Sequence, residues 1–218
     1  MPEKERICVY LRELPAQEKN GPGSHAGQKE NSRRFLLETA ADYLKRLGRQ
    51  EGTESWQIGE GERGKPFFAG HPEVCFSISH SGACWCCAFA AFPVGLDIQL
   101  RGFGRKDRMP EGQERLRLRT ERIADRFFHP GERAWLREGG DFFSVWTAKE
   151  SYVKYTGEGM GREFGSFAVA DENGMLPFVR SDGPRAALLL LPAPPSYSLC
   201  LCAERIGETE IIKMGPAL

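Results

Sequence analysis

Alternation of apolar and polar residues through the middle of the chain predicts a series of short strands. Val74, Phe76 and Ile78 alternate with smaller or polar residues, which is typical of a half-buried strand. Similar short runs recur on both sides, separated by turn-forming dipeptides such as Asn173-Gly174. The expected strands span residues 7–11, 74–79, 85–89, 94–100, 164–170, 188–191 and 198–203.

Helical periodicity predicts four helices around these strands. The first begins at Ser32 and ends near Gly48, with Phe35, Leu36 and Leu44 among the residues of its apolar stripe. The others are expected at residues 114–128, 131–138 and 142–156. Residues 12–31, 49–64 and 101–114 are polar and rich in loop-forming residues. We therefore predict an α+β (α/β) fold in two similar lobes, residues 1–100 and 101–218.

Two acidic residues stand where the periodicity predicts burial. Because Val94, Leu96 and Ile98 share one face of their strand, Asp97 and Gln99 point to the other. Glu150 lies within the helix at 142–156. Burying an ionised carboxylate is costly unless something compensates it, and a divalent cation is the simplest compensating partner. Two such acids, with lysines on the same helix, predict a site for a cation and a phosphate group.

Several basic and hydroxyl groups could complete such a site, and each has a plainer reading. Glu150 and Lys154 are four residues apart on one helical face, which alone would favour an ordinary exposed pair. Lys65, in a loop between Gly64 and Pro66, could bind phosphate as a point charge or simply aid solubility. Ser79 and His80 could donate to phosphate or belong to a turn. Adjacent strand residues point to opposite faces, which disfavours a Ser-His hydrolase.

Composition narrows the choice only slightly. Thirty basic and thirty acidic residues cancel, so net charge favours neither nucleic acid nor a membrane surface. The seven cysteines are best explained as free thiols in a reducing cytosol, and their spacing gives little support to a zinc site. The first residues are charged and no run is apolar enough to span a membrane, so we expect a cytoplasmic protein.

A local excess of positive charge occupies residues 101–126, with nine basic and five acidic residues. It could be a solvated helix face, or it could dock an acidic protein or a nucleic acid. Phe103 is the one aromatic residue among these charges, so the sequence lacks the aromatic interleaving that would support single-strand binding.

Taken together, the sequence resembles the Sfp-type 4′-phosphopantetheinyl transferases, also called holo-acyl-carrier-protein synthases. The resemblance covers about residues 32–203, and the matching pieces occur in the family's order. These pieces are Gly64-Lys65-Pro66, Phe76-Ser77-Ile78-Ser79-His80-Ser81, Val94-Gly95-Leu96-Asp97-Ile98, Ala124-Asp125-Arg126-Phe127-Phe128 with Glu132, and Trp146-Thr147-Ala148-Lys149-Glu150-Ser151-Tyr152-Val153-Lys154.

The resemblance implies a pseudo-twofold arrangement of the two lobes, with coenzyme A and Mg²⁺ in the cleft between them. It implies transfer of 4′-phosphopantetheine from coenzyme A to a serine of an apo acyl, peptidyl or polyketide carrier protein, which releases 3′,5′-ADP. Asp97 and Glu150 would then hold the metal. Gln99 stands where relatives often have a further acid, and its amide oxygen brings no charge. Glu150 would deprotonate the serine directly or through a metal-bound water, and the water route is favoured.

The family also implies contacts to coenzyme A. Lys65, Ser79 and His80 would hold its phosphates, Lys154 would neutralise the pyrophosphate, and Arg34 would be the basic residue at the start of the first helix. The loop before that helix is rich in glycine where relatives usually present basic phosphate contacts, so part of this grip could come from elsewhere.

We therefore expect a monomeric, cytoplasmic, Mg²⁺-dependent transferase that binds neither nucleic acid nor membrane, with Mn²⁺ an open alternative because oxygen ligands suit both ions. Two rival hypotheses are a non-catalytic module that binds coenzyme A or a carrier protein, suggested by Gln99, and a nucleic-acid-binding protein that uses residues 101–126.

Overall fold

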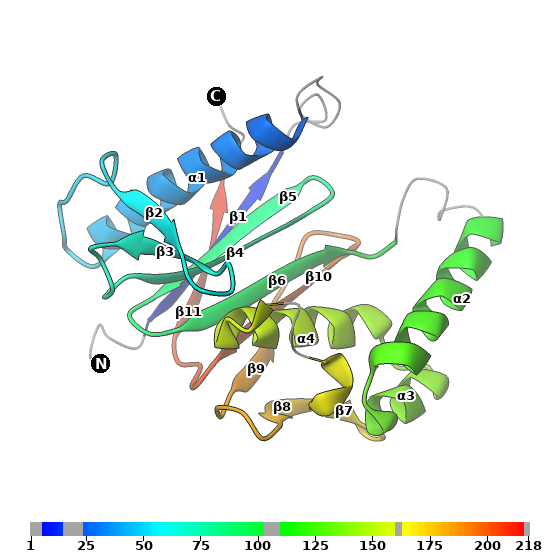
Figure 1. Cartoon of the computed structure of the whole chain (residues 1–218). Coiled ribbons are helices and arrows are strands. Elements are labelled where there is room, and N and C mark those ends of the chain that lie inside the picture. Colours follow the sequence, from blue (N-terminus) through cyan, green and yellow to red (C-terminus); the bar gives the residue numbers. More distant parts are fainter. Residues whose placement is uncertain (1–5, 15–23, 103–109, 160–162, 216–218) are drawn as a thin grey trace.

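Two larger β-sheets form the frame of the molecule, and helices cover their outer faces (Figure 1). The computed structural model describes residues 6–14, 24–102, 110–159 and 163–215. A separate two-stranded hairpin, β2 (Gln57–Glu60) with β3 (Pro66–Ala69), lies beside the first sheet.

The N-terminal sheet has the strand order β11-β1-β5-β4. Its strands are β1 (Ile7–Glu13), β4 (Cys75–Ser81), β5 (Cys84–Ala90) and β11 (Thr209–Met214). β1 pairs antiparallel with β5 and parallel with β11, so the end of the chain returns to the sheet where it began (Figure 1).

Strand β1 is buried on both faces, which explains its uninterrupted apolar sequence. Cys8 and Tyr10 face α1 (Ser24–Arg46), whose Phe35, Leu36, Tyr43 and Leu44 complete a core on that side. Ile7, Val9 and Leu11 face a second core shared with the other sheet. The alternation of a strand thus lets β1 serve two cores at once.

The C-terminal sheet has the strand order β6-β10-β9-β8-β7. Its strands are β6 (Val94–Leu100), β7 (Ala168–Asp171), β8 (Gly174–Arg180), β9 (Ala187–Leu190) and β10 (Tyr197–Ala203). Helix α4 (Phe142–Thr156) packs on one face of this sheet through a third core. α3 (Pro130–Arg137) lies against β7, and α2 (Pro110–Phe127) extends along the edge of the molecule (Figure 1). A short 3₁₀ turn, Phe164–Ser166, leads into β7.

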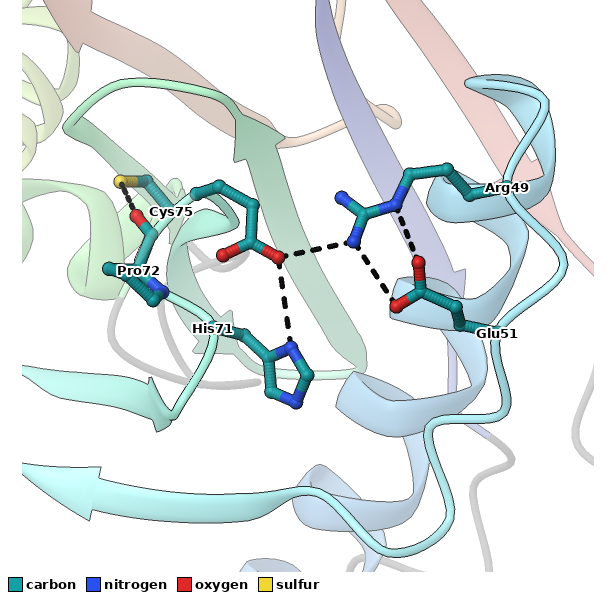
Figure 2. A network of polar contacts seen from close by, with 6 residues as sticks. Arg49, Glu51, His71, Pro72 and Cys75 are labelled. Carbon is teal, nitrogen blue, oxygen red and sulfur yellow. Dashed lines mark hydrogen bonds and ion pairs between the residues drawn. The ribbon is translucent and has the colours of Figure 1, made fainter.

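A polar network ties the end of α1 to the segment that precedes β4 (Figure 2). Arg49 donates to both carboxylate oxygens of Glu51 and to Glu73 at 3.2 Å. His71 lies 3.7 Å from the same Glu73 oxygen and stacks on Trp56 with ring centroids 3.8 Å apart. The network therefore anchors the connection between α1 and the hairpin that carries the Lys65 loop.

Most predicted elements are confirmed, together with a mixed fold of helices and sheets. The helix expected from Ser32 begins at Ser24. The prediction missed its first turns because they carry no apolar stripe. The strand expected at 164–170 is a 3₁₀ turn followed by β7. Sequence patterns missed β3, β8 and β11.

The lobe division expected at residue 100 stays a prediction, as does the pseudo-twofold relation. The sheets exchange strands across that point: β6 belongs to the C-terminal sheet and β11 to the N-terminal one. The centres of the loops expected at 12–31 and 101–114 lie outside the described residues. Among the described residues, no helix is both long and apolar enough to cross a membrane.

Helix α4 is fixed at both ends and approaches β6 unusually closely. Asp141 caps its start by accepting from the Phe143 amide at 3.1 Å, and Gly157 ends it in a left-handed conformation with φ 72°. At Gly95 of β6, a Cβ atom would lie 1.9 Å from the Ser151 carbonyl oxygen and 2.4 Å from the Tyr155 nitrogen. Only glycine allows this approach of helix to strand.

We predict that Gly95→Ala destabilises the protein by at least about 1–3 kcal/mol, because helix and strand backbones must separate to admit the methyl group. Urea unfolding followed by circular dichroism measures the change. Gly165→Ala is the matched control, because its Cβ would lie 3.5 Å from the nearest atom. Equal stability of the two variants would contradict the packing argument.

Candidate functional site

Three serine side chains of β4 join the two sheets, and we call Ser77, Ser79 and Ser81 the serine ladder. Their hydroxyl oxygens accept from alternate amides of β6: Leu96 to Ser77 at 2.9 Å, Ile98 to Ser79 at 3.3 Å and Leu100 to Ser81 at 2.9 Å. Strand alternation puts all three hydroxyls on one face. The two edge strands are therefore joined by side chains where a continuous sheet would use its backbone.

Asp97 lies beside this ladder, with its carboxylate turned away from the apolar core as the sequence predicts. Val94, Leu96 and Ile98 lie in the core shared by the sheets. The Oδ1 atom of Asp97 accepts from the Ser79 hydroxyl at 2.7 Å and from the Lys154 ammonium at 2.7 Å. Its side chain is 8% exposed and that of Lys154 is 30% exposed. The structure thus brings together three residues from β4, β6 and α4.

A cavity of about 270 Å³ opens next to this cluster. Glu150 and Lys154, one helical turn apart on α4, both line it. The other lining residues are Arg63, Gly64, Lys65, Pro66, Phe76, Ser77, Ile78, Val153, Gly157 and Gly159. The sequence-predicted residues Glu150, Lys154 and Lys65 therefore share one concave surface.

The Glu150 carboxylate is half-buried and makes no hydrogen bond to any other residue that the structure describes. Its pKa is raised, first by desolvation and then by the negative charge of Asp97, while Lys154 opposes the shift. Two carboxylates therefore share the positive charge of Lys154. Such a site favours an additional cation.

Lys65 reaches the cavity from the loop between β2 and β3, but its ammonium group is already partly engaged. Nζ donates to the carbonyl oxygens of Val94 at 3.2 Å and Tyr155 at 3.1 Å. Burial lowers its pKa. An ammonium has three donors, so one is left for a phosphate oxygen. Lys65 thus connects its loop to β6 and to the end of α4, and its phosphate role stays a prediction.

His80 and Arg34 lie elsewhere, on the side of the N-terminal sheet covered by α1. Both are exposed and neither lines the cavity. Trp85 connects the two positions. It is opposite His80 in the strand register, and its ring packs edge-on against Phe35, the residue next to Arg34. A ligand in contact with all predicted residues would therefore extend from the cavity to this second position.

Gln99 follows Asp97 on the same strand face but is turned to its own backbone. Its Nε2 donates to the Leu100 carbonyl at 3.2 Å, which leaves the amide oxygen available. Among the described residues no group of three His, Cys, Asp or Glu side chains could hold a metal. Asp97 and Glu150 still fit Mg²⁺, which often binds through one or two carboxylates and takes its other ligands from water and substrate phosphates.

Sequence reasoning missed the buried ion pair behind the site. Lys149 Nζ lies 2.9 Å from Glu132 Oε2, and both side chains are 0% exposed. The ammonium also donates to the carbonyls of Phe164 at 2.6 Å and Phe167 at 2.8 Å. Burial lowers the Lys149 pKa to about 8, and Glu132 partly offsets this effect.

Glu132 completes this connection between α3, α4 and β7. Its carboxylate accepts from the amides of His129 at 2.9 Å and Val169 at 2.8 Å. A charged residue on the apolar stripe of Phe142, Val145 and Tyr152 could have signalled such a partner. The pair fixes α4 from the side next to the cavity-lining Glu150.

Comparison with known proteins shows the family of this chain, and its mixed fold of helices and sheets is consistent with that family. The sequence model of the 4′-phosphopantetheinyl transferase superfamily matches residues 93–202, half of the chain. The chain belongs to this superfamily and is a transferase of the Sfp type.

Individual relatives carry the corresponding names. A 4′-phosphopantetheinyl transferase of Bacillus subtilis is 31% identical over 72% of this chain and 67% of its own length. The 4′-phosphopantetheinyl transferase Sfp of Bacillus subtilis (strain 168) is 29% identical over 97% of this chain and 90% of its own. The 4′-phosphopantetheinyl transferase gsp of Aneurinibacillus migulanus is 36% identical over 51% of this chain and 42% of its own.

We predict that Lys149→Met destabilises the protein by about 3–5 kcal/mol, because it leaves the Glu132 charge buried without its partner. Chemical denaturation measures the loss. In the control, Arg137→Met breaks the exposed ion pair with Asp125, which should cost less than about 1 kcal/mol. A small, equal effect of both substitutions would show that the buried pair holds nothing in place.

Proposed function

We propose that this protein transfers 4′-phosphopantetheine from coenzyme A to a serine of an apo carrier protein and releases 3′,5′-ADP. The observation that supports this most directly is the convergence of Glu150, Lys154 and Lys65 on one cavity, with Asp97 paired to Lys154 beside it. One carboxylate and two ammonium groups on the concave surface, with a second carboxylate next to it, suit a metal-bound pyrophosphate.

The reaction forms a bond from the carrier serine oxygen to the β-phosphorus of coenzyme A and breaks the bond from that phosphorus to the bridging oxygen. The bridging oxygen leaves with 3′,5′-ADP. Glu150 accepts the serine proton, directly or through a water. Because a carboxylate that also binds a metal ion is a poor base, the route through a water is favoured.

The remaining side chains would hold coenzyme A in place. Lys154 and the third donor of Lys65 would bind pyrophosphate oxygens. His80 and Arg34 would contact a more distant phosphate, consistent with their position outside the cavity. Ser79 gives its hydroxyl hydrogen to Asp97, so its contribution would be to orient that carboxylate.

Asp97 and Glu150 would hold Mg²⁺, with Gln99 contributing an amide oxygen or binding one of the water ligands. A bound Mg²⁺ supplies charge neutralisation at the pyrophosphate as the bridging bond breaks. With only two charged ligands from the chain, binding of the ion should depend strongly on the substrate phosphates.

The carrier protein would dock on α2. Arg115 and Arg122 are exposed and make no ion pair with any residue that the structure describes, whereas Arg117 is paired with Glu114 and Glu121. Leu118 and Phe127 of the same helix are 39% and 46% exposed. A surface with unpaired cations and exposed apolar groups suits an acidic protein partner. Arg105, Lys106 and Arg108 lie outside the described residues.

We predict that the protein, with coenzyme A and Mg²⁺, adds one phosphopantetheine to at least one apo carrier protein, and that EDTA prevents the addition. Intact-protein mass spectrometry of several carriers detects the added mass. Asp97→Ala and Glu150→Ala should abolish transfer without unfolding the chain. No addition to carriers that a known transferase modifies would refute the proposal, and a fully active Asp97→Ala variant would refute the metal assignment.

For the docking surface, we predict that Arg115→Glu with Arg122→Glu raises the carrier KM at least severalfold with little change in kcat, because steering charges act mainly on encounter. The effect should shrink as salt increases. Lys45→Glu with Lys213→Glu makes the same charge change on exposed lysines of the N-terminal sheet and its helix. Equal KM values for the two double variants would show that α2 is not the docking surface.

A further inference from the structure

The site carries its own counter-ion. The Lys154 ammonium lies 2.7 Å from Asp97 Oδ1, the oxygen that also accepts from Ser79. Asp97 comes from β6 and Lys154 from the last turn of α4, so this contact is tertiary. It compensates a carboxylate that is only 8% exposed.

A divalent cation on Asp97 would meet that ammonium group at close range. Two positive charges a few ångströms apart in a poorly solvated site repel strongly. Metal binding to the unloaded protein must therefore overcome Lys154 as well as desolvation. The Lys154 side chain is 30% exposed and lines the cavity, so its ammonium has somewhere else to go.

The other ammonium group of the cavity is held differently. Lys65 donates to the carbonyl oxygens of Val94 and Tyr155 and makes no ion pair with a described residue. Of these two lysines, only Lys154 competes for the carboxylate that the metal needs. Lys65 is therefore a matched control for the charge of the cavity.

We propose that Lys154 is a resident counter-ion of Asp97 that moves to the pyrophosphate of coenzyme A, and that this exchange couples coenzyme A binding to metal binding. The inference rests on the proposed function and adds a reason for the order of events within the site. Coenzyme A draws the ammonium away and frees Asp97. The metal, once bound to Asp97, releases Lys154 for the phosphate. Each ligand thus raises the affinity for the other, and by equal factors.

The test measures binding and needs no turnover. Mn²⁺ affinity is determined by electron paramagnetic resonance of the free ion, with and without coenzyme A, for the parent chain and Lys154→Met. We expect Lys154→Met to bind Mn²⁺ alone at least about tenfold more tightly than the parent, within the usual range of couplings between sites. Coenzyme A should enhance Mn²⁺ binding less in this variant than in the parent.

Three further variants make the result specific. Lys154→Arg keeps a cation that can pair with Asp97, so its metal affinity should stay at the parent's low value. Lys65→Met removes a positive charge from the same cavity but not from Asp97, and should change metal affinity little. Lys154→Gln should behave like Lys154→Met and serves if the apolar variant does not fold. Circular dichroism confirms folding of each.

Equal Mn²⁺ affinity of Lys154→Met, Lys154→Gln and the parent would overturn the inference while leaving the proposed transfer intact. A rise in affinity as large for Lys65→Met would also overturn it, because the effect would then reflect general charge. If the parent binds no Mn²⁺ with or without coenzyme A, the metal site of the proposed function fails as well.

Discussion

The serine ladder is the constraint on which the geometry of the site depends. Ser77, Ser79 and Ser81 accept from three amides of β6 and so hold the edges of two different sheets together. Because these bonds are made by serine side chains and not by the backbone of β4, the two sheets are joined without forming one continuous sheet. The middle hydroxyl also donates to Asp97, so the joint that unites the sheets orients the acid between them.

Helix α4 completes the site because it is held from two sides. Gly95 lets it approach β6, and the Lys149–Glu132 pair connects it to α3 and β7. Between these anchors Glu150 and Lys154 face the cavity. The buried Lys149–Glu132 pair has no net charge, whereas Asp97 and Glu150 both lie close to the single positive charge of Lys154. Glu150 has no ion pair of its own among the described residues, so its carboxylate is available to a metal ion.

Local patterns predicted much of this site, and tertiary contacts decided the rest. Strand alternation was enough to turn Asp97 away from the core, and helical spacing put Glu150 and Lys154 on one face. The partners of Lys65 come from β6 and α4, and no local pattern encodes such contacts. Ser79 was expected to face a phosphate, but its hydroxyl serves Asp97 and β6. β11 was missed because its residues are only half-buried and show no clear alternation, and its pairing with β1 is a tertiary contact.

The most direct test of this account is a crystal structure with coenzyme A and Mn²⁺, in which anomalous scattering locates the metal. The account predicts an anomalous peak bound by the Asp97 and Glu150 carboxylates, with the pyrophosphate in the cavity lined by Lys65 and Lys154. Coenzyme A bound away from this cavity, or a metal held by other residues, would contradict it.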